Sequence, residues 1–502
     1  MAARATRPIA GRGGLNAVIK LLLLAAGMGG IFLLVGALVV PEAGTLTFLW
    51  VLYMNVVAIA SQVYHIPAWV GGGVIVLIAI PFGVYVFLRG HRLILDSPFA
   101  WMLAFLAASL LSTTIARDRG VAFQWLFTYV SEGLLLYLLV INTIRVLPVL
   151  RRALWVLISA GSVLACLSLF QGVTGSGSQF GGLAQRNIEG YPASGQLASG
   201  QGARVPVRLG NRAAGPIGDP NRYAQILIVL LPMALLRMRA EQRRALKLLA
   251  GLAALLILGG IALTYSRGAL LALGFLALAM AALRYIRWRD LLLAPVVAIA
   301  FAVIAGPRLL QRIDTASAVP DLLQNGGSDP SEADGAIRGR LTEMLAAFAV
   351  YRDYPIIGVG PGQFAPIYSV EYMDDRDIAF RALDRTRRAH NLYLELAAET
   401  GTLGIVAFLV IVGVVCHRLW RARRFWLRTH PPSADLATSF LLCLMAYLTT
   451  ALFLHLSYQR YYWLLLALAG AAVHILRPPT EQPATSGRLL PRRERQRAAQ
   501  AW

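Results

Sequence analysis

Four polar clusters in this sequence carry the residue types that could do chemistry. They stand at the ends of long apolar stretches and contain arginine, histidine, asparagine and glycine, at 210–215 with 219–224, 265–268, 338–340, and 390–395 with 399–404. A charged side chain at membrane depth is costly and usually serves a function. Their arginines and histidine are therefore the candidate functional side chains, suited to binding an anion and to moving a proton.

Arginine is the cation in three of these clusters, as Arg212, Arg267 and Arg340, with Arg338 beside the last. A guanidinium is charged at any relevant pH and grips phosphate oxygens through two parallel donors, whereas lysine acts as a point charge. The chain has only two lysines, and both fall on the expected cytoplasmic side. The pattern favours a site for a phosphate or pyrophosphate group that gains negative charge as a bond breaks.

His390 is the best-placed general base in the sequence. An imidazole with an ordinary pKa of about 6.5 can take a proton from an attacking hydroxyl at neutral pH. The other histidines fall on the expected cytoplasmic side or, like His65 and His455, are expected outside but lack a motif. The candidate supporting residues that follow His390 are Asn391, Tyr393 and Glu399.

Each of these side chains also has a purely structural interpretation. Arg267 stands in a very short turn and could bind lipid headgroups. Arg340 could begin a helix and pair with Glu343, and His390 could cap a helix at the membrane interface. The order of the clusters and their common outward side favour the functional interpretation, while these alternatives stay open.

Neither a metal ion nor another cofactor is predicted. Asp374, Asp375 and Asp377 could bind a divalent cation, but the arginine among them favours a solvated acidic stretch. The glycine-rich run 358–362 lacks the GK[ST] ending of a phosphate-binding loop, so we interpret it as a turn.

The elements that must position these residues are membrane-spanning helices. Of the 502 residues, 57% are hydrophobic and 14% charged, against roughly 25% charged in an ordinary soluble domain. Apolar stretches long enough to cross a hydrocarbon core of about 30 Å recur through the chain. We predict an all-α polytopic membrane protein of about twelve spans, near 17–40, 69–88, 98–115, 122–142, 150–170, 220–237, 246–264, 268–284, 291–306, 391–416, 435–456 and 460–476.

The net charge of +22 comes from arginines in short loops between the spans. Such clustering orients a membrane protein by the positive-inside rule, so nucleic acid is not an expected partner and membrane lipids are. With twelve spans both termini are cytoplasmic. The segment 46–64 would break this parity, so it is interpreted as re-entrant or interfacial.

Two long segments are expected outside the cytoplasm, an outer loop at 171–219 and a cap at 307–390. The cap divides the chain into an N-terminal bundle 1–306, the cap itself, C-terminal spans 391–476 and a basic cytoplasmic tail 477–502. Within the cap a helix with an apolar stripe is predicted to stop before Pro355 and to lay that stripe on the rest of the protein. The stripe consists of Leu341, Met344, Leu345, Phe348 and Tyr351.

From 210 to 404 the chain resembles the O-antigen ligase-like superfamily, which holds O-antigen ligases, O-antigen polymerases and some protein O-oligosaccharyltransferases. The resemblance rests on the segment from Arg340 through Pro355, the glycine-rich run, and His390-Asn391 with Glu399. It implies a GT-C-like bundle and a metal-independent, inverting glycosyltransferase. Arg267 and Arg340 would hold the donor pyrophosphate, Arg212 and Asn221 would lie near it, and His390 would be the general base.

The resemblance further implies an undecaprenyl-pyrophosphate-linked glycan as donor and an active site facing the periplasm from the bacterial inner membrane. Lipid A-core as acceptor makes the protein a ligase, which we favour because no additional soluble domain is visible. A carrier-linked glycan would make it a polymerase, and a protein hydroxyl an oligosaccharyltransferase. A lipid-linked oligosaccharide transporter and a non-catalytic envelope assembly protein are the alternatives from other classes.

Overall fold

The computed structural model describes residues 36, 38–67, 73–188, 209–289, 335–368, 371–372, 387–456 and 458–478. These residues are almost entirely helical, with one short two-stranded hairpin, which confirms the predicted all-α class. The expected span 291–306, most of 17–40 and the basic tail after residue 478 lie outside the described residues. The four-part division of the chain therefore stays a prediction.

The first half of the chain forms mostly long helices. They are α2 (Pro41–Tyr53), α3 (Val56–Gln62), η1 (Gly73–Ile75), α5 (Val76–Gly83), η2 (Val84–Leu88), α6 (Ser97–Thr113), α7 (Arg119–Tyr129), η3 (Val130–Leu135), α8 (Leu136–Thr143), α9 (Leu147–Thr174) and η4 (Phe180–Gly182). The hairpin strands are β1 (Gln185–Ile188) and β2 (Leu209–Gly215), and the second half contains α10 (Pro220–Ala240), α11 (Arg244–Ala262), α12 (Arg267–Ala282), α16 (Gly335–Asp353), η6 (Phe364–Tyr368), α18 (Leu392–Thr429), α19 (Pro431–Thr450) and α20 (Gln459–Ile475).

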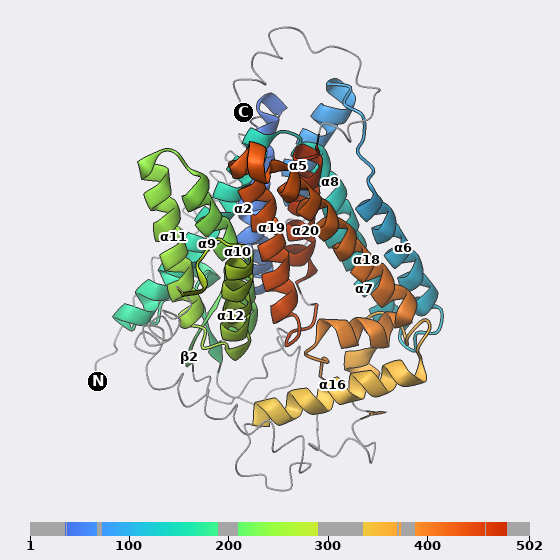
Figure 1. The fold of residues 1–502 in the computed structure, drawn as a ribbon. Coiled ribbons are helices and arrows are strands. Elements are labelled where there is room, and N and C mark those ends of the chain that lie inside the picture. The colour runs from blue at the N-terminus through green and yellow to red at the C-terminus, as the bar shows by residue number, and fades with distance from the viewer. Residues whose placement is uncertain are drawn as a thin grey trace, which may run out of the picture.

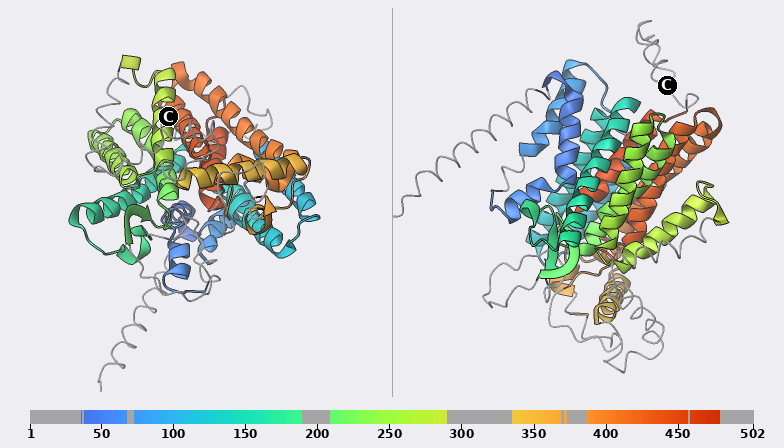
Figure 2. Two further views of the ribbon diagram at one scale, coloured as in Figure 1. Left: turned by 90° about the horizontal axis from the view of Figure 1, so that it is seen from below. Right: turned by 90° about the vertical axis from the view of Figure 1, so that its left-hand side faces the viewer.

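Most of these helices run side by side through one bundle, and α16 lies across one end of it (Figures 1 and 2). Six described helical segments are long and apolar enough to cross a membrane: Arg119–Thr143, Leu147–Thr174, Pro220–Ala240, Arg244–Ala262, Leu392–Thr429 and Pro431–Thr450. The pair α2 and α3, bent by 49°, is either a seventh crossing or a re-entrant segment. The structure thus shows a multi-pass helical bundle, while the count of about twelve spans stays a prediction.

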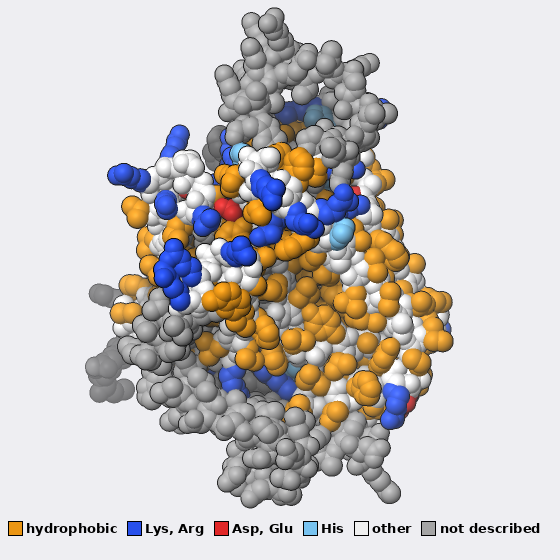
Figure 3. Space-filling view, viewed as in Figure 1, with side chains coloured by type: hydrophobic (Ala, Val, Ile, Leu, Met, Phe, Trp, Pro, Cys, Tyr) orange, Lys and Arg blue, Asp and Glu red, His pale blue; other side chains and the backbone are white. Residues whose placement is uncertain are grey.

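Arginines gather at the end of the bundle opposite α16, here called the basic end (Figure 3). Arg145 donates a 3.0 Å hydrogen bond to the carbonyl of Arg92, and Arg239 lies 3.6 Å from Asp435. Tyr285, just after α12, donates to the same aspartate at 2.8 Å. The short basic loops of these segments therefore share one end, as predicted from their charge.

Three helices begin at the α16 end, each with a polar cap. Asp219 caps α10, Ser266 caps α12 and Asn391 caps α18, and each side chain accepts a hydrogen bond from a backbone N–H of the first turn. Such caps satisfy N–H groups that have no partner inside the helix. Because helix N-termini carry partial positive charge, this end of the bundle favours an anion.

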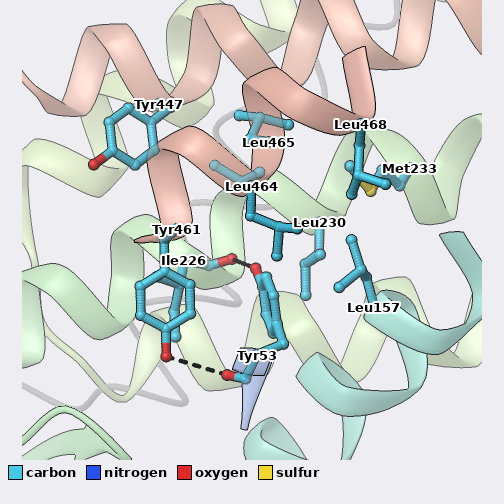
Figure 4. A pocket seen from close by; sticks show the side chains of 11 residues that line it. Tyr53, Leu157, Ile226, Leu230, Met233, Tyr447, Tyr461, Leu464, Leu465 and Leu468 are labelled. Carbon is cyan, nitrogen blue, oxygen red and sulfur yellow. Dashed lines mark hydrogen bonds between the residues drawn. The ribbon is translucent and has the colours of Figure 1, made fainter. Parts of the chain in front are cut away.

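Tyr53 fastens the bent pair α2 and α3 to the bundle core. Its hydroxyl donates a 2.6 Å hydrogen bond to the carbonyl of Ile226, and its own carbonyl accepts one of 3.1 Å from the Tyr461 hydroxyl (Figure 4). Both bonds border an apolar pocket lined mainly by leucines. The bend follows at Asn55, whose side chain donates to the carbonyl of Pro216 at 2.8 Å. The segment expected to be re-entrant or interfacial is thus a broken helix anchored at its bend.

The expected outer loop 171–219 contains the hairpin. Strands β1 and β2 pair in antiparallel fashion, with Arg186 opposite Ala213. The N–H of Ala213 donates a 2.9 Å hydrogen bond to the carbonyl of Leu263, which precedes α12. This bond holds strand β2, and with it Arg212, against the turn that contains Arg267.

The predicted helix of the cap is α16, but its buried face differs from the predicted one. Ala346, Ala347 and Val350 are buried, whereas Leu345 and Phe348 of the predicted stripe are 38% and 52% exposed. Alanine side chains let α16 approach its neighbours closely, and the larger residues then point outward. The expectation that the large apolar stripe packs on the rest of the protein is therefore wrong for Leu345 and Phe348, while Leu341, Met344 and Tyr351 are half-buried.

Helix α18 breaks at Gly401, which corrects the expected uninterrupted span 391–416. Gly401 has φ 62° and ψ −167°, a conformation essentially confined to glycine. The backbone N–H groups of Thr402 and Leu403 donate to the carbonyls of Pro355 and Ile356, at 2.8 and 3.2 Å. The break separates a buried first arm of α18 from the long helix that follows, and it ties that junction to the segment after α16.

Gly401→Ala is expected to destabilise the fold by about 1–3 kcal/mol or more, because the backbone conformation is strained for any L side chain. A Cβ atom there would also stand 2.3 Å from backbone atoms of Ile356. Gly413→Ala is the matched control in the same helix, where a Cβ meets nothing within 4 Å. We expect the control to be neutral or slightly stabilising. Thermal unfolding of both variants in the same detergent measures the difference, and equal transition temperatures would contradict it.

Candidate functional site

Three of the four clusters singled out from the sequence, all but the one that contains His390, border a narrow pocket at the α16 end. Its lining residues come from the starts of α10 and α12, from α16 and from the turn after α19, and are Asn221, Ser266, Gly268, Ala269, Arg340, Thr450, Phe453 and Leu454. Arg267 is the first residue of α12, between two of these lining residues. Arg340 and the Arg267 turn therefore border one pocket although they are far apart in the sequence.

His390 lies beside Arg340 through the carboxylate of Glu343. The imidazole Nε2 is 3.5 Å from Glu343 Oε2, and Glu343 follows Arg340 by one helical turn of α16. Glu343 is 1% exposed, and it also lies 3.6 Å from the guanidinium of Arg387. The structure thus places the predicted base, His390, beside the face of α16 that carries Glu343, one helical turn after the predicted Arg340.

Burial and surrounding arginines keep His390 neutral. Its loss of solvent and the charges of Arg340, Arg222, Arg387 and Arg388 lower its pKa to about 3. A neutral imidazole has a nitrogen lone pair that can accept a proton at any pH between about 5 and 8. The nearby Glu343 carboxylate would stabilise the imidazolium that forms when it does.

A buried ion pair orients the chain on which His390 lies. The guanidinium of Arg388 donates to Glu395 Oε1, with a 2.9 Å bond from Nε, and the backbone N–H of Ala389 donates to Oε2 at 3.0 Å. Glu395 is 3% exposed. Its carboxylate thereby satisfies two groups in succession and holds the turn that ends at His390, where φ is +49°.

Arg212 and Asn221, both expected near the donor, contact each other and other atoms of the protein. Arg212 Nε donates a 2.8 Å hydrogen bond to the carbonyl of Thr264, and Nη2 donates one of 2.9 Å to Asn221 Oδ1. Asn221 also lines the pocket. Arg212 therefore connects the hairpin, the start of α10 and the turn before Arg267, which makes it a positioning residue in this structure.

The predicted supporting residues hold the backbone around His390. Asn391 Oδ1 accepts from the backbone N–H of Tyr393 and of Leu394, both at 3.0 Å. The Tyr393 hydroxyl donates to the carbonyl of Leu448 at 2.9 Å. Glu399 is 1% exposed, and its carboxylate accepts a 3.3 Å hydrogen bond from the N–H of Phe364. The glycine-rich run before Phe364 forms a turn, as predicted, with positive φ at three of its glycines.

Three residues of this region escaped the prediction of the site. From the sequence, Glu343 was considered only as a structural partner of Arg340, although the two residues are one helical turn apart. Arg222 stands in the Asp-Pro-Asn-Arg run and is 4% exposed, and His455, also 4% exposed, packs edge-on against His390 with ring centres 5.4 Å apart. No sequence motif marks His455, because only the folded chain places it beside His390.

Two predicted features lie outside the described residues. The side chain of Arg338 is one, although its backbone belongs to α16, and the acidic stretch 374–377 is the other. In the part of the chain that the structure describes, no group of three or more histidine, cysteine, aspartate or glutamate side chains is placed to hold a metal ion.

One part of the chain matches a known protein family. Residues 251–409 match the family model described as O-Antigen ligase. The match contains Arg267, Arg340, Glu343 and His390, while Arg212 precedes it. A search among curated proteins finds no match. The matched region and the helical bundle support a place for this chain in the O-antigen ligase-like superfamily of multi-pass membrane proteins.

Proposed function

We propose that this protein transfers a glycan from undecaprenyl-pyrophosphate onto a hydroxyl group of lipid A-core, at the periplasmic face of the bacterial inner membrane. The observation that carries the proposal is the meeting of Arg340, the Arg267 turn and the neutral His390 at one end of a membrane bundle. The basic end opposite the site supports the orientation, because arginine-rich loops favour the cytoplasm.

The chemical step needs a base, an acceptor and a stabilised leaving group. His390 would take the proton of the acceptor hydroxyl as its oxygen attacks the anomeric carbon. The bond between that carbon and the phosphate oxygen breaks, and the pyrophosphate leaves with the electron pair. Attack from the face opposite the leaving group inverts the anomeric centre. Arg267 and Arg340 would stabilise the charge that grows on the bridging oxygen, which is where fixed cations are most effective.

Donor binding would also strengthen the base. Arg340 and Arg222 are among the groups that lower the pKa of His390. An anionic pyrophosphate beside these guanidinium groups offsets their charge, so the imidazole pKa rises towards its usual range only when donor is bound. Proton transfer would therefore be favoured in the donor complex over the free enzyme.

The rate constant kcat/KM for the donor should show no acid limb near pH 6.5, because His390 of the free enzyme titrates near 3. The same lowered pKa makes the folding stability depend on pH. An unfolded imidazole binds a proton below about pH 6.5 that the folded one refuses, so folding stability falls as pH decreases from there towards 3. A pH series of kcat/KM for the donor from pH 5 to 8, measured with purified enzyme at donor concentrations well below KM, tests this. A kcat/KM that is half-maximal near pH 6.5 would contradict it.

Reconstitution tests the proposed function directly. Purified protein in lipid nanodiscs is given an undecaprenyl-pyrophosphate glycan and, separately, lipid A-core, a second carrier-linked glycan or a serine-containing peptide. We expect a lipid A-core product with an inverted linkage, formed equally well with chelator present because arginine supplies the positive charge. Product on another acceptor would reassign the acceptor, and transport of the donor without any product would overturn the enzyme assignment.

A further inference from the structure

Arg222 is a buried arginine with an unfilled hydrogen-bonding position. It stands in the first turn of α10, its side chain is 4% exposed, and its Nη2 has no hydrogen-bond partner among the described residues. No carboxylate of the described chain lies within ion-pair distance of it. An arginine held this way is costly, since a buried charge is stable only when it is paired and hydrogen-bonded. The missing partner is therefore expected to be an anion that binds.

The space beside Arg222 adjoins the candidate site. Arg222 lines a small pocket together with Ile217, Gln225, Ile226, Tyr447, Tyr458 and Tyr461. Gln225 Nε2 donates a 2.9 Å hydrogen bond to Thr450 Oγ1, and Thr450 lines the pocket that contains Asn221 and Arg340. This bonded pair is the wall between two neighbouring pockets, each with an arginine in its lining.

A second group near Arg222 also has an unfilled position. His455 is 4% exposed, and its Nδ1 lacks a partner within the described segments. Burial and the charges of Arg222, Arg388, His390 and Arg340 lower its pKa well below the usual value, so its imidazole is neutral and one ring nitrogen can donate a hydrogen bond. Behind Arg222 the walls are apolar, because Tyr447, Tyr461 and Ile226 also line the leucine-rich pocket of Figure 4. Such surroundings strengthen an interaction between charges.

We propose that Arg222 binds one phosphate of the donor pyrophosphate, while Arg340 and the Arg267 turn bind the other. The inference rests on the proposed function and adds a residue to it. The two phosphates of a pyrophosphate share one bridging oxygen, so Gln225 and Thr450, which stand between the two narrow pockets, must move apart for the donor to contact both arginines. Arg222 thereby makes the site selective for a pyrophosphate over a monophosphate.

The test compares two lipids that differ by one phosphate. Full-length protein in nanodiscs is titrated with undecaprenyl pyrophosphate and with undecaprenyl phosphate, in the absence of any acceptor. Arg222→Gln is expected to weaken pyrophosphate binding by about tenfold or more, the usual loss for a hydrogen bond to a charged group. Monophosphate binding should change by less than about twofold, since the other arginines still hold that phosphate.

A matched control and a milder variant keep the test decisive. Arg423 is an 8% exposed arginine of α18 at the basic end, so Arg423→Gln removes a similarly buried guanidinium far from the site. Its effect on both lipids should stay below about twofold. If Arg222→Gln fails to fold, Arg222→Lys keeps the charge but loses the two-donor grip, and should still lower pyrophosphate binding selectively, by about threefold or more.

Each outcome has a definite meaning. A wild-type protein that binds neither lipid contradicts the proposed function itself. A wild-type preference for pyrophosphate that survives in both Arg222 variants overturns only the assignment of Arg222. An equal loss of both lipids in these variants overturns it too, because Arg222 would then act on the site as a whole.

Discussion

Replacing His390 by glutamine is expected to lower glycan transfer by about 10²- to 10⁴-fold, the usual contribution of a general base. Glutamine fills similar space and keeps a polar group near Glu343, but it cannot accept the proton of the acceptor hydroxyl. The loss should appear in kcat, because the imidazole accepts a proton in the transition state and does not contribute to donor binding. Single-turnover assays with saturating donor and acceptor measure this rate.

His417→Gln is the control for this prediction. His417 is an exposed residue of the long part of α18, away from the pocket. Its replacement should leave the rate within about twofold of the wild type. Full activity of the His390 variant at normal expression would mean that another group takes the proton, and the proposed mechanism would fail even if transfer itself is real.

Replacing Arg340 by glutamine is expected to lower kcat by about 10²- to 10³-fold, as when one fixed donor is removed from a developing negative charge. Arg340 lines the pocket with Asn221 and the turn at Ser266. Its charge is most valuable as the bond to the bridging oxygen breaks, so donor affinity should fall less than kcat. Arg340→Lys should recover part of the rate. Lysine keeps the positive charge of arginine but lacks its two parallel hydrogen-bond donors.

Arg352→Gln is the matched control on the same helix. Arg352 lies near the end of α16, where its side chain is 64% exposed and pairs with the neighbouring Asp353. An exposed pair of this kind contributes little, so transfer should be unchanged. If Arg340→Gln raised only the KM of the donor and left kcat intact, Arg340 would be a binding residue without a part in leaving-group stabilisation.

Much of the helical layout can be predicted from local sequence. In a membrane every backbone N–H and C=O must find a hydrogen-bond partner within the protein, so a long apolar stretch commonly forms a helix. The stretches predicted at 98–115, 150–170 and 220–237 accordingly match α6, α9 and α10 to within a few residues, except that α9 extends further at both ends. The basic loops could be placed at one end for a similar reason, because charge near a membrane is sorted by side.

The candidate site was predictable in its residue types but not in its contacts. Arg267, Arg340 and His390 follow from position and chemistry, since few side chains bind phosphate or titrate near neutral pH. The meeting of Arg340 with the Arg267 turn depends on α10 and α12 beginning where α16 lies. Partners such as His455 come from the loop between α19 and α20, and no spacing along the chain encodes them.

Local sequence determined where helices form, which loops are basic and which polar groups are candidates, because each of these properties belongs to a short stretch of chain. Folding in three dimensions settled the rest, such as the alanine face of α16, the break at Gly401 and the burial of Arg222. These features depend on which surfaces pack together. The sequence of a helix only weakly favours burial of one face until the neighbouring helices are in place. Packing then selects the face that allows close approach.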